Sequence, residues 1–160
     1  MAALPWVDSH CHLYMAEAPS EQLLERAVAA GVGWLMAPGI DLESTLQARA
    51  VAERHPERII WSAGLHPHDA ARWPDEGGRL ATLASDAAAI GEIGLDFYRN
   101  LAPREAQLVA FRAQLRLGAD LGKPVIIHCR DAFEEIYAEL ETADLGERAV
   151  LHCWTGGPKW

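Results

Sequence analysis

Short apolar runs alternate along the chain with longer stretches in which Leu, Ala and Ile recur at helical spacing. Such alternation predicts repeated strand and helix units, which build a parallel sheet covered by helices. The expected strands are Trp6–His12, Gly33–Gly39, Ile59–Pro67, Ala89–Asp96, Pro124–Arg130 and Ala149–Trp154. The expected helices between them are Ser20–Ala30, Leu42–Arg54, Gly78–Ser85, Pro103–Leu121 and Ala132–Leu140.

Histidines gather at the carboxyl ends of these expected strands. Of the 7 histidines, only His55 follows an expected helix instead. The others lie at or just after strand ends, and they are His10, His12, His66, His68, His128 and His152. Glu92 and Asp96 lie along the fourth strand, and Arg130 ends the fifth. Doubly wound sheets and (β/α)₈ barrels both carry chemistry at strand ends, but only the barrel gathers many strand ends around one point.

This gathering favours a barrel. The fold prediction is therefore α/β, of the (β/α)₈ TIM-barrel type, represented by about six βα units in a chain of 160 residues. Six units do not close an eight-stranded barrel, so we expect open edges at the first and sixth strands. No linker or low-complexity tract divides the chain, and residues 1–160 are predicted to form a single incomplete domain.

Charge and cysteine content indicate which partners the protein binds and in which compartment it acts. The chain has 14 Lys and Arg against 23 Asp and Glu, a net charge of −9, which argues against binding through a broad basic face. A local phosphate site around bound cations stays compatible with that charge. Three cysteines and the absence of a basic, apolar leader predict a reducing, cytoplasmic location without membrane attachment.

The motif DSHCHL places His10 and His12 two residues apart, so both rings face one side of the expected strand and can bind one metal ion. Cys11 then points to the opposite side. The same alternation in IIHCR and LHCW turns Cys129 and Cys153 toward the outer helices. We therefore expect all three cysteines to be buried small hydrophobic residues, with metal binding or thiol reactivity as the alternative.

Glu92 is a carboxylate within the otherwise apolar strand AIGEIGLD, and glycines on either side clear space around it. Burying a carboxylate unpaired is costly, and a bound cation offsets that cost. One carboxylate can also bridge two cations about 3.5–4 Å apart, as in dinuclear hydrolytic sites. The alternative is a buried salt bridge from Glu92 to Arg99 or Arg130.

Five motifs in this order and at βα spacing resemble those of the TatD family of metal-dependent deoxyribonucleases, within the metallo-dependent amidohydrolase superfamily. They are DSHCHL, AGLHPHD, GEIGLDFYR, PVIIHCRDA and LHCWTGG. The resemblance runs through the whole chain and covers the N-terminal part of the family's barrel.

The resemblance implies a role for each matching residue. His10 and His12 would ligate a first metal ion, and His128 and His152 a second, with Glu92 bridging the two. His66 and Arg130 match positions beside the substrate and would act with Glu92 in catalysis, and Tyr98 and Arg99 would be further substrate contacts. The family's last ligand is an Asp from the eighth strand, and no Asp follows the sixth expected strand here. Asp96 comes too early in the chain to take that place.

The implied activity is hydrolysis of DNA by a metal-activated water, as a 3′-to-5′ exonuclease that uses two divalent ions, Zn²⁺, Mn²⁺ or Mg²⁺. Imidazole ligands favour Zn²⁺ or Mn²⁺, because Mg²⁺ prefers oxygen donors. One alternative is an ester or amide hydrolase of the same superfamily, such as a D-aminoacyl-tRNA deacylase. The other is an inactive, truncated fragment that self-associates through its open edges.

Overall fold

The computed structural model describes residues 5–152 and 156–157. Within them, six parallel strands form one sheet in the order β1-β2-β3-β4-β5-β6. The strands are β1 Trp6–Asp8, β2 Val32–Pro38, β3 Ile59–Ala63, β4 Ala89–Asp96, β5 Val125–Arg130 and β6 Ala149–His152. Because each strand pairs with the next one along the chain, the sheet is singly wound, which excludes the doubly wound alternative.

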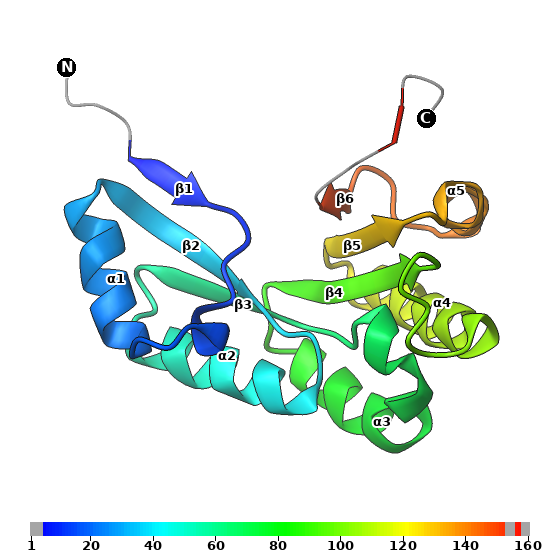
Figure 1. Cartoon of the computed structure of the whole chain (residues 1–160), viewed down its shortest axis with the longest axis horizontal. Helices are drawn as coiled ribbons and strands as arrows, with labels where there is room; N and C mark the ends of the chain where they lie inside the picture. Colours follow the sequence, from blue (N-terminus) through cyan, green and yellow to red (C-terminus); the bar gives the residue numbers. More distant parts are fainter. Residues whose placement is uncertain (1–4, 153–155, 158–160) are drawn as a thin grey trace.

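Helices connect the strands and cover one side of the sheet. The α-helices are α1 Ser20–Ala29, α2 Leu42–Arg54, α3 Trp73–Ala84, α4 Arg104–Leu121 and α5 Phe133–Thr142, and the short 3₁₀ helices are η1 Leu13–Met15 and η2 Pro67–Arg72. Figure 1 shows the sheet as an open trough, with β1 and β6 at its two rims and the α-helices along its outer side. The expected TIM-barrel type with six strands and an unclosed barrel is confirmed.

The strand β4 lies at the centre of the core, and all 8 of its residues are buried. Its apolar side chains join one core cluster with β5 and α4, whose fully buried members include Ile90, Ile93, Leu95, Phe111 and Ile127. Burying one such side chain stabilises the fold by about 1.5–3 kcal/mol. The core thereby fixes the two strands that carry most of the polar residues of interest.

The expected extent of the first strand was wrong. β1 ends at Asp8 and not at His12, because the Asp8 side chain accepts a hydrogen bond from the His10 N–H at 3.1 Å, which turns the backbone out of the ladder. The chain still follows β2, since the Cys11 N–H donates to the Met36 carbonyl at 2.9 Å. The two histidines of DSHCHL therefore project from a loop beyond the strand.

The expected start of the third helix was also wrong. α3 begins at Trp73 rather than Gly78. Pro74 occupies its first turn, where the missing N–H would have had no helical partner. Gly77 is tolerated inside the helix because it lies against the Trp73 ring, where a Cβ would come within 2.8 Å of that ring.

The third strand is shorter than expected, ending at Ala63 because Pro67 begins η2 instead. In the last expected strand, Cys153 and Trp154 lie outside the described residues. Of the helices in the described part of the chain, none has the length and apolar content of a membrane-spanning segment.

A capping box begins α2. The Asp41 side chain accepts from the Ser44 N–H at 2.8 Å, and the Ser44 hydroxyl accepts from the Asp41 N–H at 2.9 Å. Burial raises the pKa of the Asp41 carboxyl, but hydrogen bonds from Ser44 and the charge of Arg72 outweigh burial, and the pKa is lowered from its ordinary value of 3.8. The helix start is therefore held by an ionised carboxylate.

We predict that Asp41→Ala lowers the free energy of unfolding by about 1 kcal/mol, because it leaves helix N–H groups without a partner. Since the folded-state pKa is lowered, this contribution is present above pH 3.8 and is lost as the pH falls below it. Urea unfolding at neutral and acid pH measures both effects. Glu43→Ala, an exposed acid in the same turn, is the control, and an equal loss in both variants would contradict the prediction.

Candidate metal centre

Polar side chains from distant parts of the chain converge on Glu92, in the middle of β4. His10 lies in the loop after β1, and His12 is the N-cap of η1. His128 projects from β5, and His152 ends β6. Together these five residues form what we call the Glu92 cluster, at the carboxyl ends of the strands, which is where TIM barrels place their active sites.

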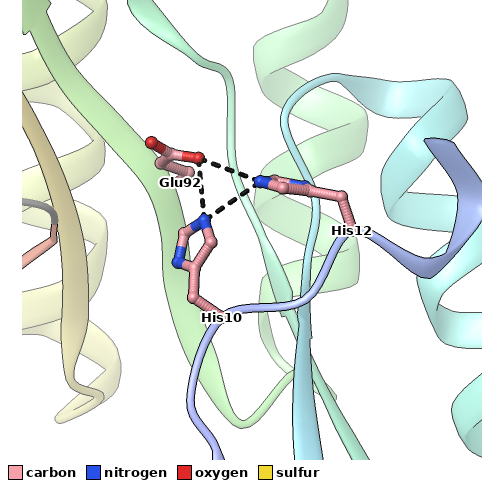
Figure 2. Close-up of side chains that lie close together, drawn as sticks. All are labelled: His10, His12 and Glu92. Atoms are coloured by element: carbon pink, nitrogen blue, oxygen red, sulfur yellow. Dashed lines mark hydrogen bonds and ion pairs between the residues drawn. The ribbon is translucent and has the colours of Figure 1, made fainter. Parts of the chain in front are cut away.

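One carboxylate oxygen of Glu92 faces the two histidines of DSHCHL. Glu92 Oε2 lies 3.2 Å from His10 Nε2 and 3.5 Å from His12 Nε2, and the two nitrogens are 3.0 Å apart. Figure 2 shows the three side chains pointing toward one another. With metal bonds of about 2.0–2.1 Å, ligand atoms of a tetrahedral zinc site stand about 3.3 Å apart. The triangle therefore has the size of one face of such a site.

The other oxygen faces a second set of imidazoles. Glu92 Oε1 lies 3.1 Å from His128 Nδ1, 3.7 Å from His66 Nε2 and 3.9 Å from His152 Nε2. The His152 ring also stacks on the His10 ring, with 3.6 Å between centroids and 9° between planes. The two oxygens thus point to separate groups of nitrogens, as a carboxylate that bridges two cations must.

The environment of Glu92 keeps it ionised. Glu92 is 4% exposed, and burial raises its pKa, but the close contacts with the imidazoles of His10, His12 and His128 outweigh burial and hold the pKa far below its usual range. Among the described residues, the basic side chains within ion-pair distance of this carboxylate are imidazoles. The alternative of a salt bridge to arginine is therefore not what the structure shows.

His66 differs from the other histidines of this region. Its Nδ1 accepts a hydrogen bond from the His68 backbone N–H at 3.2 Å, so Nδ1 carries no proton. Burial lowers the pKa of His66 to about 3, and the ring is neutral at physiological pH. A neutral ring with a bare Nδ1 carries its proton on Nε2, the atom that faces Glu92. His66 is therefore a hydrogen-bond donor into the cluster, although its distances alone would also fit a ligand.

The remaining residues expected to contact substrate are Arg130, Tyr98 and Arg99, and the structure places Arg99 apart from the other two. The Arg130 guanidinium stacks over the Tyr98 ring, 4.0 Å from its centroid, and that ring is 64% exposed. Arg99 is exposed, and its backbone N–H donates to Asp96. Arg130 and Tyr98 thus form one shared surface, whereas the contact of Arg99 with Asp96 is made by its backbone.

Sequence reasoning assigned no role to two residues that contact the cluster, Asp96 and Tyr14. Asp96, 1% exposed, meets the Nε2 atoms of His68 and His128, and the Tyr14 hydroxyl meets His12 Nδ1. An acid at the end of a fully buried strand was the available signal for Asp96. Nothing in the local pattern around Tyr14 distinguishes it from a packing residue.

The two described cysteines are free thiols outside the cluster. Cys129 is buried, and that burial raises the pKa of its thiol to about 11. Cys11 is half-buried against the core, and burial likewise raises its pKa. Both thiols therefore stay protonated and behave as small apolar residues. The expected burial is found for Cys129, whereas Cys11 is only half-buried and Cys153 lies outside the described residues.

A half-barrel of parallel strands with imidazoles around a buried carboxylate at its strand ends is the arrangement of a metal-dependent hydrolase of the TIM-barrel type. The family model described as TatD related DNase matches residues 7–160. The chain therefore belongs to the TatD related DNase family.

Curated relatives agree with this placement. The chain is 47% identical over 141 residues to a protein of Enterobacter lignolyticus and 45% identical over 141 residues to one of Citrobacter rodentium, both named 3′-5′ ssDNA/RNA exonuclease TatD. Each alignment covers 85% of this chain and 54% and 53% of the respective relative. The chain thus spans about half the length of the curated relatives it matches.

Solved structures share the fold. The TatD homologue YJJV of Escherichia coli superposes with a TM-score of 0.80 at 26% identity, covering 95% of this chain and 61% of that one. A TatD family hydrolase of Entamoeba histolytica gives a TM-score of 0.83 at 22% identity, covering 96% of this chain and 60% of that one, a likeness of fold alone.

We predict that Gly94→Ala lowers the free energy of unfolding by more than about 2 kcal/mol. Gly94 has φ +139°, and a Cβ there would lie 1.9 Å from the backbone oxygen of His128, its partner in the ladder. Chemical unfolding measures the loss. Gly78→Ala is the matched control, because a Cβ at that exposed helical position meets nothing within 4 Å and should be neutral or stabilising. Comparable stability of the two variants would contradict the prediction.

Proposed function

We propose that the protein is a divalent-metal-dependent nuclease that hydrolyses phosphodiester bonds from the 3′ end of single-stranded DNA or RNA. The observation that carries the proposal is the placement of the two Glu92 oxygens, one toward His10 and His12 and the other toward His128 and His152. Family membership and the names of the curated relatives support the choice of nucleic acid as substrate.

The donor set fits a pair of divalent cations. His10, His12 and Glu92 would hold one, and Glu92, His128 and His152 the other. Nitrogen-rich ligation suits Zn²⁺ or Mn²⁺ better than Mg²⁺. Cations bound here would lower the pKa of a coordinated water and polarise a phosphoryl oxygen.

The residues of the chain itself supply the rest of the proposed catalysis. His66 directs its Nε2–H toward the Oε1 side of Glu92, 3.7 Å away, and can donate to a phosphoryl oxygen bound there. Arg130 offers a permanent positive charge for the phosphate, and its guanidinium is held against the Tyr98 ring. The exposed face of Tyr98 is available for contact with a nucleobase.

We further propose that residues 1–160 act as a single unit of this hydrolase type, and that free thiols at Cys11 and Cys129 suit a reducing, cytoplasmic setting. Substrate contact would be local to the cluster, because the chain carries a net charge of −9 and offers few cationic groups to a long phosphate backbone.

The rims of the sheet favour self-association of the isolated chain. Trp6 of β1 is 76% exposed and Val150 of β6 is 54% exposed, and strands with a free edge pair readily with other chains. We expect dimers or larger species in sedimentation velocity, with the proportion rising with concentration. A monodisperse monomer across the concentration range would contradict this expectation.

We predict that the protein shortens single-stranded DNA from its 3′ end in Mn²⁺ and not in EDTA. Glu92→Ala should lower the rate of this cleavage by at least about 100-fold, because replacing even a residue that only contacts a metal ligand lowers activity by up to this factor. Fluorescently labelled oligonucleotides resolved on a denaturing gel measure the rate. Glu57→Ala removes an exposed carboxylate and should digest DNA like the parent.

Two results, one from this assay and one from a parallel assay with an aminoacyl ester, would contradict the proposal. Cleavage that persists in EDTA or in Glu92→Ala would mean that the cluster is not the catalytic site. Turnover of an aminoacyl ester without any cleavage of DNA or RNA would assign the cluster to carbonyl chemistry instead.

A further inference from the structure

Two of the imidazoles that face Glu92 are contacted from behind by a polar side chain. His12 presents Nε2 to the cluster and Nδ1 to the Tyr14 hydroxyl, at 2.8 Å. His128 presents Nδ1 to Glu92 and Nε2 to Asp96, at 3.3 Å. Because a neutral imidazole binds a cation through its unprotonated nitrogen, the partner at the far nitrogen decides whether the near one is available.

The proton positions around Tyr14 follow from its partners. The Tyr14 hydroxyl lies 2.6 Å from the backbone carbonyl of Pro38, which can only accept a hydrogen bond. The single phenolic proton is therefore used at Pro38, and the oxygen must accept from His12 Nδ1–H. With its proton fixed on Nδ1, the neutral His12 ring presents a lone pair on Nε2, the atom that faces Glu92.

The orientation of Asp96 is fixed by backbone contacts. Its own N–H donates to Gln107 Oε1 at 2.9 Å, its carbonyl accepts from Gln107 Nε2 at 3.3 Å, and both side chains are at most 1% exposed. Asp96 Oδ1 accepts from the Arg99 N–H at 2.8 Å. Oδ2 is left facing the two imidazoles, His68 Nε2 at 2.7 Å and His128 Nε2 at 3.3 Å.

We propose that Tyr14 and Asp96 are positioning residues that set the tautomers of His12 and His128, so that each ring turns an unprotonated nitrogen toward a cation at Glu92. The inference rests on the proposed metal centre. The reverse arrangement at His66, whose Nδ1 accepts from a backbone N–H, yields a donor instead of a ligand by the same reasoning. Fixed hydrogen-bond partners thus make His12 and His128 metal ligands and His66 a hydrogen-bond donor.

Substitution of Asp96 by Asn gives a specific expectation. The Arg99 N–H needs an acceptor, so the amide oxygen takes the place of Oδ1 and the NH₂ group takes the place of Oδ2. The NH₂ group then donates toward His128 Nε2, which must become the unprotonated nitrogen, and the ring proton moves to Nδ1, 3.1 Å from Glu92 Oε1. Asp96→Asn should therefore block the metal-binding nitrogen, whereas Asp96→Ala only leaves the tautomer unfixed.

Zinc affinity of the purified chain tests the proposal, measured by competition with a chromophoric chelator. We expect Tyr14→Phe and Asp96→Ala each to raise the dissociation constant of one Zn²⁺ by about 10- to 100-fold, the range found for partners of metal ligands, and Asp96→Asn to raise it further. Asp120→Asn makes the same chemical change as Asp96→Asn at an exposed position on α4, outside the cluster, and should bind zinc like the parent.

The order of zinc affinities of Asp96→Asn and Asp96→Ala distinguishes a positioning role of Asp96 from a structural one. A merely structural role predicts that Asp96→Ala, which removes all side-chain hydrogen bonds, is the worse variant. Equal zinc affinity of Asp96→Asn and the parent would overturn the proposal for Asp96, and equal affinity of Tyr14→Phe and the parent would overturn it for Tyr14.

A metal-free measurement keeps this inference distinct from the proposed function. Long-range ¹H–¹⁵N spectra of the imidazoles, with His12 assigned by its own substitution, should show the neutral His12 ring protonated at Nδ1 in the parent, a preference lost in Tyr14→Phe. If the parent shows that tautomer but binds no zinc, the metal centre fails and the tautomer assignment stands. A neutral His12 ring protonated at Nε2 in the parent would overturn the assignment.

Discussion

The buried carboxylate of Glu92 is the interaction on which the arrangement of the site depends. An ionised group in a strand whose residues are all buried would destabilise the fold if it were left unpaired. Here its two oxygens are met by imidazoles from the loop after β1 and from β5, which lie on opposite sides of β4 in the sheet. Folding of the half-barrel and assembly of the site are therefore the same process, because the sheet must curve for these groups to reach Glu92.

Helix α4 fixes the strand ends that carry this site. Gln107 hydrogen-bonds both the N–H and the carbonyl of Asp96, and Gln114, two turns further along, does the same for Leu65, the residue before His66. Both glutamines are at most 1% exposed. Each replaces the ladder hydrogen bonds that a strand loses where it ends, so buried backbone groups stay paired and the polar residues beside them keep one position.

The sequence predicted the fold and the composition of the site better than its hydrogen bonding. The order of strands, the fully buried β4 and the convergence of His10, His12 and Glu92 follow from hydrophobic pattern and strand-end placement, which are local signals. The early end of β1 at Asp8 was missed because it depends on a side-chain turn. Asp96 was missed because its partner His128 lies 32 positions away, and no local pattern records such a pair. Tyr14 lies only two residues from His12, but the direction of their hydrogen bond depends on the Pro38 carbonyl, 24 positions from Tyr14.

Contact between side chains at the two rims of the trough explains how six strands bring the Glu92 cluster together. His10 follows β1 and His152 ends β6, the two outermost strands, yet their rings stack at 3.6 Å. In Figure 1, β1 and β6 stand apart at the two rims of the trough, so contact between their ends is made by side chains and not by backbone pairing. The Glu92 cluster therefore needs the curvature of the sheet but no hydrogen bonding between its edges. Strands added beyond β6 would enclose the cluster and could add ligands, without having to bring its members together.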